Sequence, residues 1–330
     1  MPRLTAGAFT AIAVGVATAL TVARASGCQH SVAAPGVGAS LQTVEALELL
    51  PPDADVVGMM DLAAARQSDA LSAVTGGAGL DMLSPGGSAE FDAFVRQTGF
   101  DPGRDLDRVY LAAPAAGETG RAAFVGYGRF SRERIERFLA TQTEREMEAT
   151  DVDGVPAYFA TDSTGRRGGF ALPSDRVVLA GDEATVRQML ARMSTSGGTP
   201  APDLQALLDR VAFPDGAWFV ARNLRDRAGR ASGSDEPGAL AARMADGVAV
   251  SMDFGRDGVP VRAFVRTTQP DEFADVLRGG VSAARMGAKD EPAFLSALDG
   301  VEIAPADGGV AVEAFLSAAL LAEMHARKGQ

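Results

Sequence analysis

The sequence is nearly free of the residues on which metal and thiol chemistry depends. Its 330 residues contain one cysteine, Cys28, and two histidines, His30 and His325. A structural zinc site needs about four thiolate or imidazole ligands, and redox thiols act in pairs. We therefore expect no bound transition metal and no cofactor. We also expect no Ser-His-Asp or Cys-His catalytic group, because Cys28 and His30 fall on an N-terminal segment with nothing to orient them. His325 falls on a segment of helical periodicity, where we expect a half-exposed structural role.

Lysine is also scarce. Lys289 and Lys328 are the only two, so arginine carries almost all of the basic charge. The chain has 31 basic and 43 acidic residues, which gives a formal net charge of −12. An acidic chain is repelled by nucleic acid and by anionic lipid head groups. We therefore expect no nucleic-acid partner.

Apolar material for a folded core is plentiful. Hydrophobic residues make up 46% of the chain and charged residues 22%, which is a globular composition and not that of a disordered chain. The length suits one large domain or two of ordinary size.

The longest apolar run covers residues 4–23, follows Arg3, and carries no charge. Three interpretations compete: the h-region of a secretory signal peptide, an uncleaved membrane anchor, and a buried helix. Small residues dominate the run and also follow it, which favours the signal peptide. The run is longer than the about 7–15 residues of a typical h-region, so the uncleaved anchor stays open.

The stretch Ala-Ser-Gly-Cys, Ala25 to Cys28, resembles the lipobox of bacterial lipoproteins. The resemblance implies that residues 1–27 are a signal peptide and that Cys28 is lipidated and becomes the mature N-terminus. Gln29 then implies sorting to the outer membrane, facing the periplasm, in a host with two membranes. The sequence departs from the lipobox at Ala25, where an aliphatic residue such as leucine is usual. Residues 23–25 also fit an ordinary A-x-A cleavage site, which would give a soluble secreted or periplasmic protein with a free thiol.

Composition also predicts where the folded body begins and divides. Residues 28–40 contain Pro and Gly without periodicity, which is typical of a flexible tether. Gly, Pro, Ser and Thr cluster again at 194–203, which marks the best internal boundary. We therefore expect a first half over residues 41–200 and a second half over residues 201–330.

Local repeats support the division into two halves. A Pro-Asp turn followed by an apolar strand occurs twice, and the spacing from Pro52 to Leu62 equals that from Pro214 to Leu224. Two later pairs of segments share an order of strand and then helix: 121–140 with 259–278, and 176–193 with 308–324. The sequence thus predicts an internal repeat.

Short turns such as 254–259 join the expected strands, which indicates antiparallel pairing. We expect an α+β fold: antiparallel sheets, amphipathic helices packed on one face, and two related β-β-α-rich halves. The phrase from Leu49 to Leu62, together with residues 98–112, resembles a loose group of uncharacterised secreted or lipid-anchored bacterial proteins. That resemblance implies the two-part body and no catalytic residues.

Carboxylates are the remaining candidates for chemistry. Asp101, Asp105 and Asp107 form one cluster, and Asp151 and Asp153 form another. Oxygen clusters can bind calcium, but the further ligands of an EF-hand loop are absent, and Asp beside Gly or Pro is usually turn chemistry. Paired carboxylates of a hydrolase stay open, because sequence does not show the distance between them.

Phosphate and ligand sites have weaker signals. The stretch 126–131 lacks the third glycine of a dinucleotide-binding loop, and 179–184 places an acid where phosphate would bind. Three aromatic residues could line an apolar pocket, although such residues usually belong to the core: Phe213, Trp218 and Phe219.

The sequence therefore predicts a membrane-anchored envelope lipoprotein, attached through Cys28, that is a non-enzymatic binding or scaffolding protein with an unknown protein or small-molecule partner. The alternative is a secreted or anchored hydrolase that uses carboxylates.

Overall fold

The computed structural model describes residues 39–69, 89–114, 122–141, 147–161, 165–195, 198–214, 216–225, 241, 243–288 and 292–328. The predicted signal peptide (1–27) and all but the last two residues of the predicted tether (28–40) lie outside the described residues.

The first half of the chain supplies thirteen described elements: α2 (Leu41–Leu49), β1 (Val56–Asp61), α3 (Leu62–Gln67), α5 (Ala89–Thr98), α6 (Pro102–Asp105), β2 (Leu106–Ala113), β3 (Ala123–Gly128), α7 (Arg132–Thr141), β4 (Met147–Val152), β5 (Val155–Thr161), β6 (Arg167–Ala171), β7 (Val177–Asp182) and α8 (Glu183–Ser194).

The second half supplies α9 (Pro202–Leu208), β8 (Ala217–Arg222), β9 (Gly247–Met252), β10 (Gly258–Arg266), α12 (Pro270–Gly287), α13 (Pro292–Asp299), β11 (Glu302–Ala306), β12 (Gly309–Ser317) and α14 (Ala318–Lys328).

Short polar side chains start several of the helices. Ser40 Oγ accepts a hydrogen bond from the backbone N–H of Thr43 (3.2 Å) at α2, and Asp182 Oδ1 accepts one from Thr185 (2.7 Å) at α8. These bonds satisfy N–H groups that have no partner inside the helix. Pro270 occupies the first turn of α12, where its missing N–H costs nothing.

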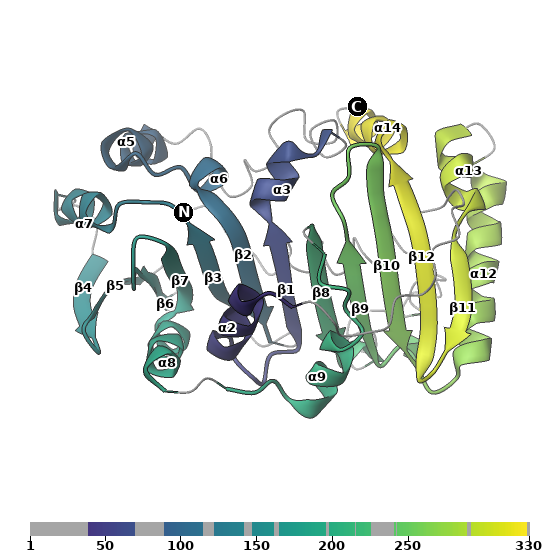
Figure 1. Cartoon of the computed structure of the whole chain (residues 1–330), viewed down its shortest axis with the longest axis horizontal. Coiled ribbons are helices and arrows are strands. Elements are labelled where there is room, and N and C mark those ends of the chain that lie inside the picture. The colour runs from purple at the N-terminus through teal and green to yellow at the C-terminus, as the bar shows by residue number, and fades with distance from the viewer. Residues whose placement is uncertain are drawn as a thin grey trace.

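The described strands form one twelve-stranded antiparallel sheet (Figure 1). Its order is β11-β12-β10-β9-β8-β1-β2-β3-β7-β6-β5-β4. The halves meet in the middle, where β1 pairs with β8: Val56 lies opposite Ala221, and Met60 lies opposite Ala217. The sheet is therefore continuous across the boundary that the sequence predicts.

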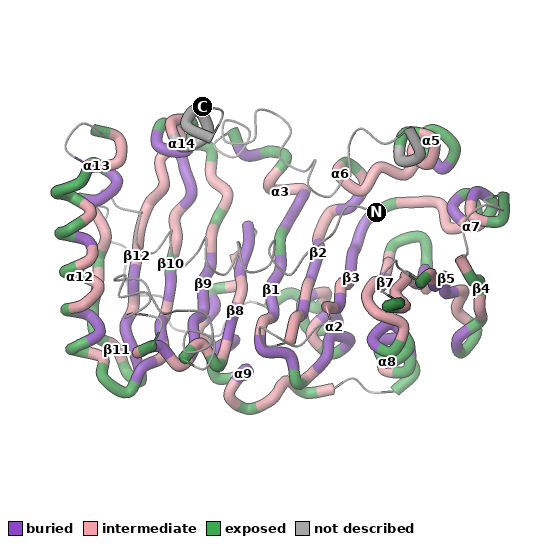
Figure 2. Tube along the Cα trace, turned by 180° about the vertical axis from the view of Figure 1, so that it is seen from behind, coloured by how far each residue is buried: buried purple, intermediate pink, exposed green. Residues whose placement is uncertain are grey.

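Helices cover both faces of this sheet. Along β8, Trp218 and Val220 belong to a core with α2, α8 and α9, hereafter the α2–α8–α9 core. Their neighbours Phe219 and Ala221 pack instead with Phe273 and other residues of α12, hereafter the α12 core. Because successive side chains of a strand point to opposite faces, the two cores lie on opposite sides of the sheet. Figure 2 shows α12 alongside β11 and β12 at one end of the sheet.

The α+β class and the antiparallel pairing are confirmed. The structure adds two details to that expectation. The strands form one sheet and not several, and the helices are not restricted to one face, because the strands near the junction are apolar on both sides. A strand that is apolar on both sides needs a packed layer on each face.

The connection between the halves is fastened to the first half. The N–H of Gly198 donates to the carbonyl oxygen of Glu48 (3.2 Å), and that of Ala201 donates to the carbonyl oxygen of Pro52 (3.2 Å). The guanidinium of Arg192 donates to the carbonyl oxygens of Leu49 and Leu50 at the end of α2. The described part of this segment is thus bonded to the body.

The two Pro-Asp phrases do not place equivalent positions alike. Val56 and Trp218 are each four residues after the proline of their phrase, yet Val56 packs in the α12 core and Trp218 in the α2–α8–α9 core. Residues at the same distance from the two prolines therefore do not face the same side of the sheet. The relation between the halves at 41–200 and 201–330 stays a prediction, and superposing their strands would test it.

In the described residues, no helix has both the length and the apolar character needed to cross a membrane. The apolar run at residues 4–23 lies outside them.

Candidate functional site

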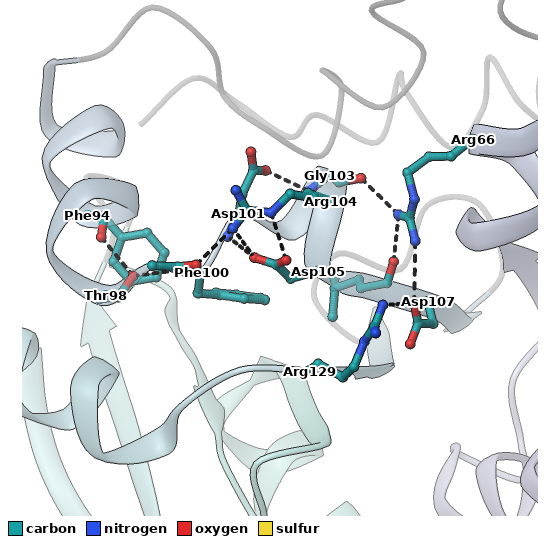
Figure 3. Close-up of polar contacts among 12 residues, drawn as sticks. Arg66, Phe94, Thr98, Phe100, Asp101, Gly103, Arg104, Asp105, Asp107 and Arg129 are labelled. Atoms are coloured by element: carbon teal, nitrogen blue, oxygen red, sulfur yellow. Dashed lines mark hydrogen bonds and ion pairs between the residues drawn. The ribbon is translucent and has the colours of Figure 1, made fainter.

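The candidate functional site surrounds the short helix α6, where the predicted acids Asp101, Asp105 and Asp107 lie among arginines (Figure 3). Hereafter the α6 cluster means six residues: Arg66, Asp101, Arg104, Asp105, Asp107 and Arg129. The chain passes here from α5 through α6 into β2. Asp, Pro and Gly at positions 101–103 favour this turn, since Asp caps a helix and Pro tolerates its first position.

Asp101 and Asp105 hold the turn together. Asp101 Oδ1 accepts a hydrogen bond from the N–H of Gly103 (2.9 Å), and Asp105 Oδ2 accepts one from the N–H of Asp101 (2.8 Å). The guanidinium of Arg104 donates to both oxygens of Asp105: Nε to Oδ1 (2.8 Å) and Nη2 to Oδ2 (2.7 Å). Its Nη2 also donates to the carbonyl oxygen of Gly99 (2.9 Å).

Asp107 and Arg66 connect this turn to the rest of the sheet. Arg66, from α3, donates to the carbonyl oxygens of Gly103 (2.9 Å) and Leu106 (2.8 Å). Its Nη2 lies 3.4 Å from Asp107 Oδ1, and Nη2 of Arg129 lies 3.6 Å from the same oxygen. The cluster therefore fastens α3, α6 and the ends of β2 and β3 to one another.

The electrostatics keep Asp105 ionised. Burial by itself raises the pKa of this carboxyl, but three favourable interactions outweigh it: the Arg104 hydrogen bonds, the Asp101 N–H, and the charges of Arg104 and Arg129. The net result is a lowered pKa. A general acid of a hydrolase needs the opposite shift.

The same arrangement does not favour a bound cation at the α6 cluster. Each acid of the α6 cluster already accepts from a backbone N–H or contacts an arginine. Within the described residues, no group of three or more His, Cys, Asp or Glu side chains is placed to hold a metal ion. The arginines neutralise the charge that would attract calcium.

The second predicted pair of acids makes a hairpin turn. Asp151 Oδ1 accepts from the N–H of Gly154 (2.8 Å), and Asp153 has a positive φ of 54° between β4 and β5. Asp tolerates this left-handed conformation better than most residues. The pair is separate from the α6 cluster in the sheet, since β4 and β2 are not neighbours.

The two loops considered for phosphate are occupied by protein groups. Asp175 Oδ1 accepts from the N–H of Arg132 (2.8 Å) at the start of α7, and Ser131 Oγ accepts from Arg134 (3.3 Å). At α8, Asp182 caps the helix. Both helix N-termini carry a carboxylate of the chain itself where an anion would bind.

The three aromatic residues do not form one lining. Trp218 is 1% exposed, and its ring centroid lies 5.3 Å from that of Phe213 in an edge-on contact. Phe219 points to the opposite face and packs against the α12 core. Alternation along β8 separates them, so the structure assigns Phe213 and Trp218 to one core and Phe219 to the other.

Cys28 and His30 lie outside the described residues. His325 lies on α14, but its side chain also lies outside what the structure describes.

The sequence did not predict a second polar group. It is named here the junction cluster and consists of Asp53, Asp55, Asp203, Arg222 and Asn223. Arg222 Nη1 donates to Asp203 Oδ1 (2.8 Å), and its Nη2 donates to the carbonyl oxygen of Asp53 (2.8 Å). Its Nε lies 2.9 Å from Asp55 Oδ1 in an ion pair that lacks hydrogen-bond alignment. Asn223 Nδ2 donates to the same Asp55 oxygen (2.8 Å). No sequence signal joins these residues, because the partners lie up to 169 positions apart.

No protein-family model matches the chain, and no curated protein matches it. Three crystal structures of TP0453 are similar to it. Form III has a TM-score of 0.50 at 10% identity over 85% of this chain and 97% of that chain. Form IV has 0.49 at 11% over 84% and 95%, and form I has 0.48 at 10% over 85% and 96%. At this identity, the likeness to form III shows a shared fold alone.

Proposed function

We propose that the chain is an envelope lipoprotein, held in the membrane by a lipid on Cys28, whose folded body acts without catalysis as a binding or scaffolding protein. In a host with two membranes, the body faces the periplasm from the outer membrane. One observation carries the proposal. The only cysteine of the sequence comes shortly after its longest apolar run, and small residues directly precede it.

The start of the body supports this placement. The first described helix, α2, begins at Leu41 with Ser40 as its cap. The 12 residues from Gln29 to Ser40 reach at most about 40 Å when fully extended. A lipid on Cys28 therefore keeps the start of the body within about 40 Å of the membrane.

The polar groups of the body support the non-enzymatic half of the proposal. The α6 cluster and the junction cluster both hold backbone segments in place through paired arginines and carboxylates. Asp105 has a lowered pKa, which suits a structural ion pair. Among the residues that the structure describes, no observation favours the hydrolase alternative.

Replacing the cysteine tests the anchor. We expect Cys28→Ser, made in the native host, to move the protein from the membrane to the soluble fraction. Several acyl chains on one residue anchor stably, whereas one chain gives an association constant of only about 10⁴ M⁻¹. The measurement is membrane fractionation of wild type and variant, with the intact mass of the wild-type mature chain.

Two results would contradict the proposal that Cys28 is lipidated. A mature chain that starts at Ser26 with a free thiol would show cleavage after Ala25. A membrane-bound chain that keeps Met1 would show an uncleaved anchor. Cys28→Ala is the matched control, because it also removes the thiol and must fractionate like Cys28→Ser.

A further inference from the structure

The central strands β1 and β8 meet with a symmetric register. Both have six residues, and their pairs step evenly away from the pair Gly58–Phe219. Two positions before Gly58, Val56 lies opposite Ala221; two positions before Phe219, Ala217 lies opposite Met60. As in any antiparallel pair, exchanging the two strands about this central pair leaves the ladder unchanged.

The hydrogen bonds at the ends of the ladder follow the same relation. The N–H of Asp61 donates to the carbonyl oxygen of Gly216 (2.7 Å), and the N–H of Arg222 donates to that of Asp55 (2.9 Å). Asp61 and Arg222 are each three positions after the central pair, and Asp55 and Gly216 are each three positions before it.

The packing obeys the relation as well. The inner residues Val57 and Met59 of β1, and Trp218 and Val220 of β8, are all buried in the α2–α8–α9 core. Each pair stands one position before and one after the central pair. A helix precedes each strand, α2 before β1 and α9 before β8, and both helices contribute to this core.

The order of strands continues outward alike on both sides. From the centre, the sheet runs β8-β9-β10-β12-β11 in one direction and β1-β2-β3-β7-β6 in the other, where β5 and β4 extend it by two further strands. In each direction, three successive strands are followed by the last strand of that half and then by the strand before it.

We infer that the β1–β8 junction is a pseudo-twofold interface between two halves of related strand order, and that the same interface forms between two copies of the chain when they exchange halves. When two copies exchange halves, β1 of each chain pairs with β8 of the other and makes the contacts that form within one chain. The seven-residue connection from Thr195 to Ala201 favours pairing within the chain, since it keeps the local concentration of the partner strand high.

A cross-strand disulfide distinguishes the two pairings. Met60 and Ala217 lie between the hydrogen-bonded pairs of the ladder, where the Cα atoms approach to about 4.5 Å and a disulfide fits. The variant is Met60→Cys with Ala217→Cys in a Cys28→Ser chain, so that only the new pair can react. The chain is unfolded, refolded over a range of concentrations and oxidised, and the products are separated without reductant.

We expect intrachain disulfides in dilute refolding and interchain disulfides in a closed dimer at high concentration. The ratio of interchain to intrachain disulfide should rise about tenfold for a tenfold rise in concentration, because pairing between chains is bimolecular. The dimer should keep the buried Trp218 emission of the monomer.

The matched control is Arg262→Cys with Glu313→Cys, an equally placed pair between β10 and β12 inside the second half. It should stay intrachain at every concentration. Intrachain bonds alone from the junction pair, or interchain bonds equally frequent in the control, would overturn the inference. Val56→Cys with Ala221→Cys repeats the test at the symmetric position, in case the first pair does not refold.

Discussion

At the scale of single residues, the junction cluster shows how few groups hold two distant segments together. Arg222 is 14% exposed and Asp55 is 10% exposed, so this ion pair is largely out of water. Arg222 also reaches Asp203 at the start of α9 and the backbone of Asp53 before β1. One guanidinium therefore links the ends of β1, β8 and α9.

Removing that guanidinium should be costly. We expect Arg222→Ala to lower the free energy of unfolding by about 3 kcal/mol, because it leaves Asp55 buried without its cation. Urea unfolding of wild type and variant measures the difference. The matched control is Arg137→Ala on α7, whose pair with Glu133 is 68% and 79% exposed. The control should change stability by less than about 1 kcal/mol, because exposed ion pairs contribute little. Equal losses in both variants would show that Asp55 does not depend on Arg222.

The same scale shows what sequence can predict of a site. Asp beside Pro and Gly predicts turn chemistry, and Asp101 and Asp151 do accept from the backbone of their own turns. The sequence does not predict that Arg66 and Arg129 meet at Asp107. That meeting depends on the pairing of β1 with β2 and of β2 with β3, which is long-range information.

At the scale of elements, α12 shows a local preference overridden by packing. It is an 18-residue helix that contains Gly279 and Gly280 near its middle. Glycine inside a helix costs about 0.8–1.0 kcal/mol relative to alanine. Phe273, Ala274 and Val281 are buried in this helix, and their burial maintains the helix despite its glycines.

Steric contacts do not require glycine at either of these two positions. A Cβ added at either position would have no atom within 4 Å outside its own helix. We therefore expect Gly279→Ala and Gly280→Ala each to raise the free energy of unfolding by about 0.5–1 kcal/mol. Thermal or urea unfolding measures the gain. Gly169→Ala on β6 is the control, since its Cβ would lie 1.9 Å from the carbonyl oxygen of Tyr158. It should destabilise; a loss of stability in α12 as well would mean that the helix needs its glycines.

Strand faces are harder to predict than strands. The Pro-Asp phrases do lead into β1 and β8, but equal spacing put Val56 and Trp218 at matching places although they face opposite cores. A shift of one residue moves every side chain of a strand to the other face. The α+β class follows from strand and helix patterns, whereas the single sheet and the two-sided packing of helices depend on which strands meet.

At the scale of the whole molecule, the α2–α8–α9 core spans the boundary between the halves. It includes Leu179 of β7 and Val125 of β3 from the first half, and Trp218 of β8 and Ala249 of β9 from the second. The sheet and the fastened connection cross the same boundary. Neither half can lose its structure without exposing apolar surface of the other, so we expect both to unfold together.

The only tryptophan gives a direct test of this coupling. Trp218 lies in the second half and is 1% exposed, so its fluorescence reports the unfolding of that half. Leu179 is 0% exposed in the first half, with β3, β2 and β1 between its strand and β8. We expect Leu179→Ala to lower the free energy of unfolding by about 3 kcal/mol. If the halves are coupled, the urea midpoint from Trp218 fluorescence falls as far as the midpoint from far-ultraviolet circular dichroism. A Trp218 midpoint that stays at the wild-type value while the dichroism splits into two transitions would show that the halves unfold independently.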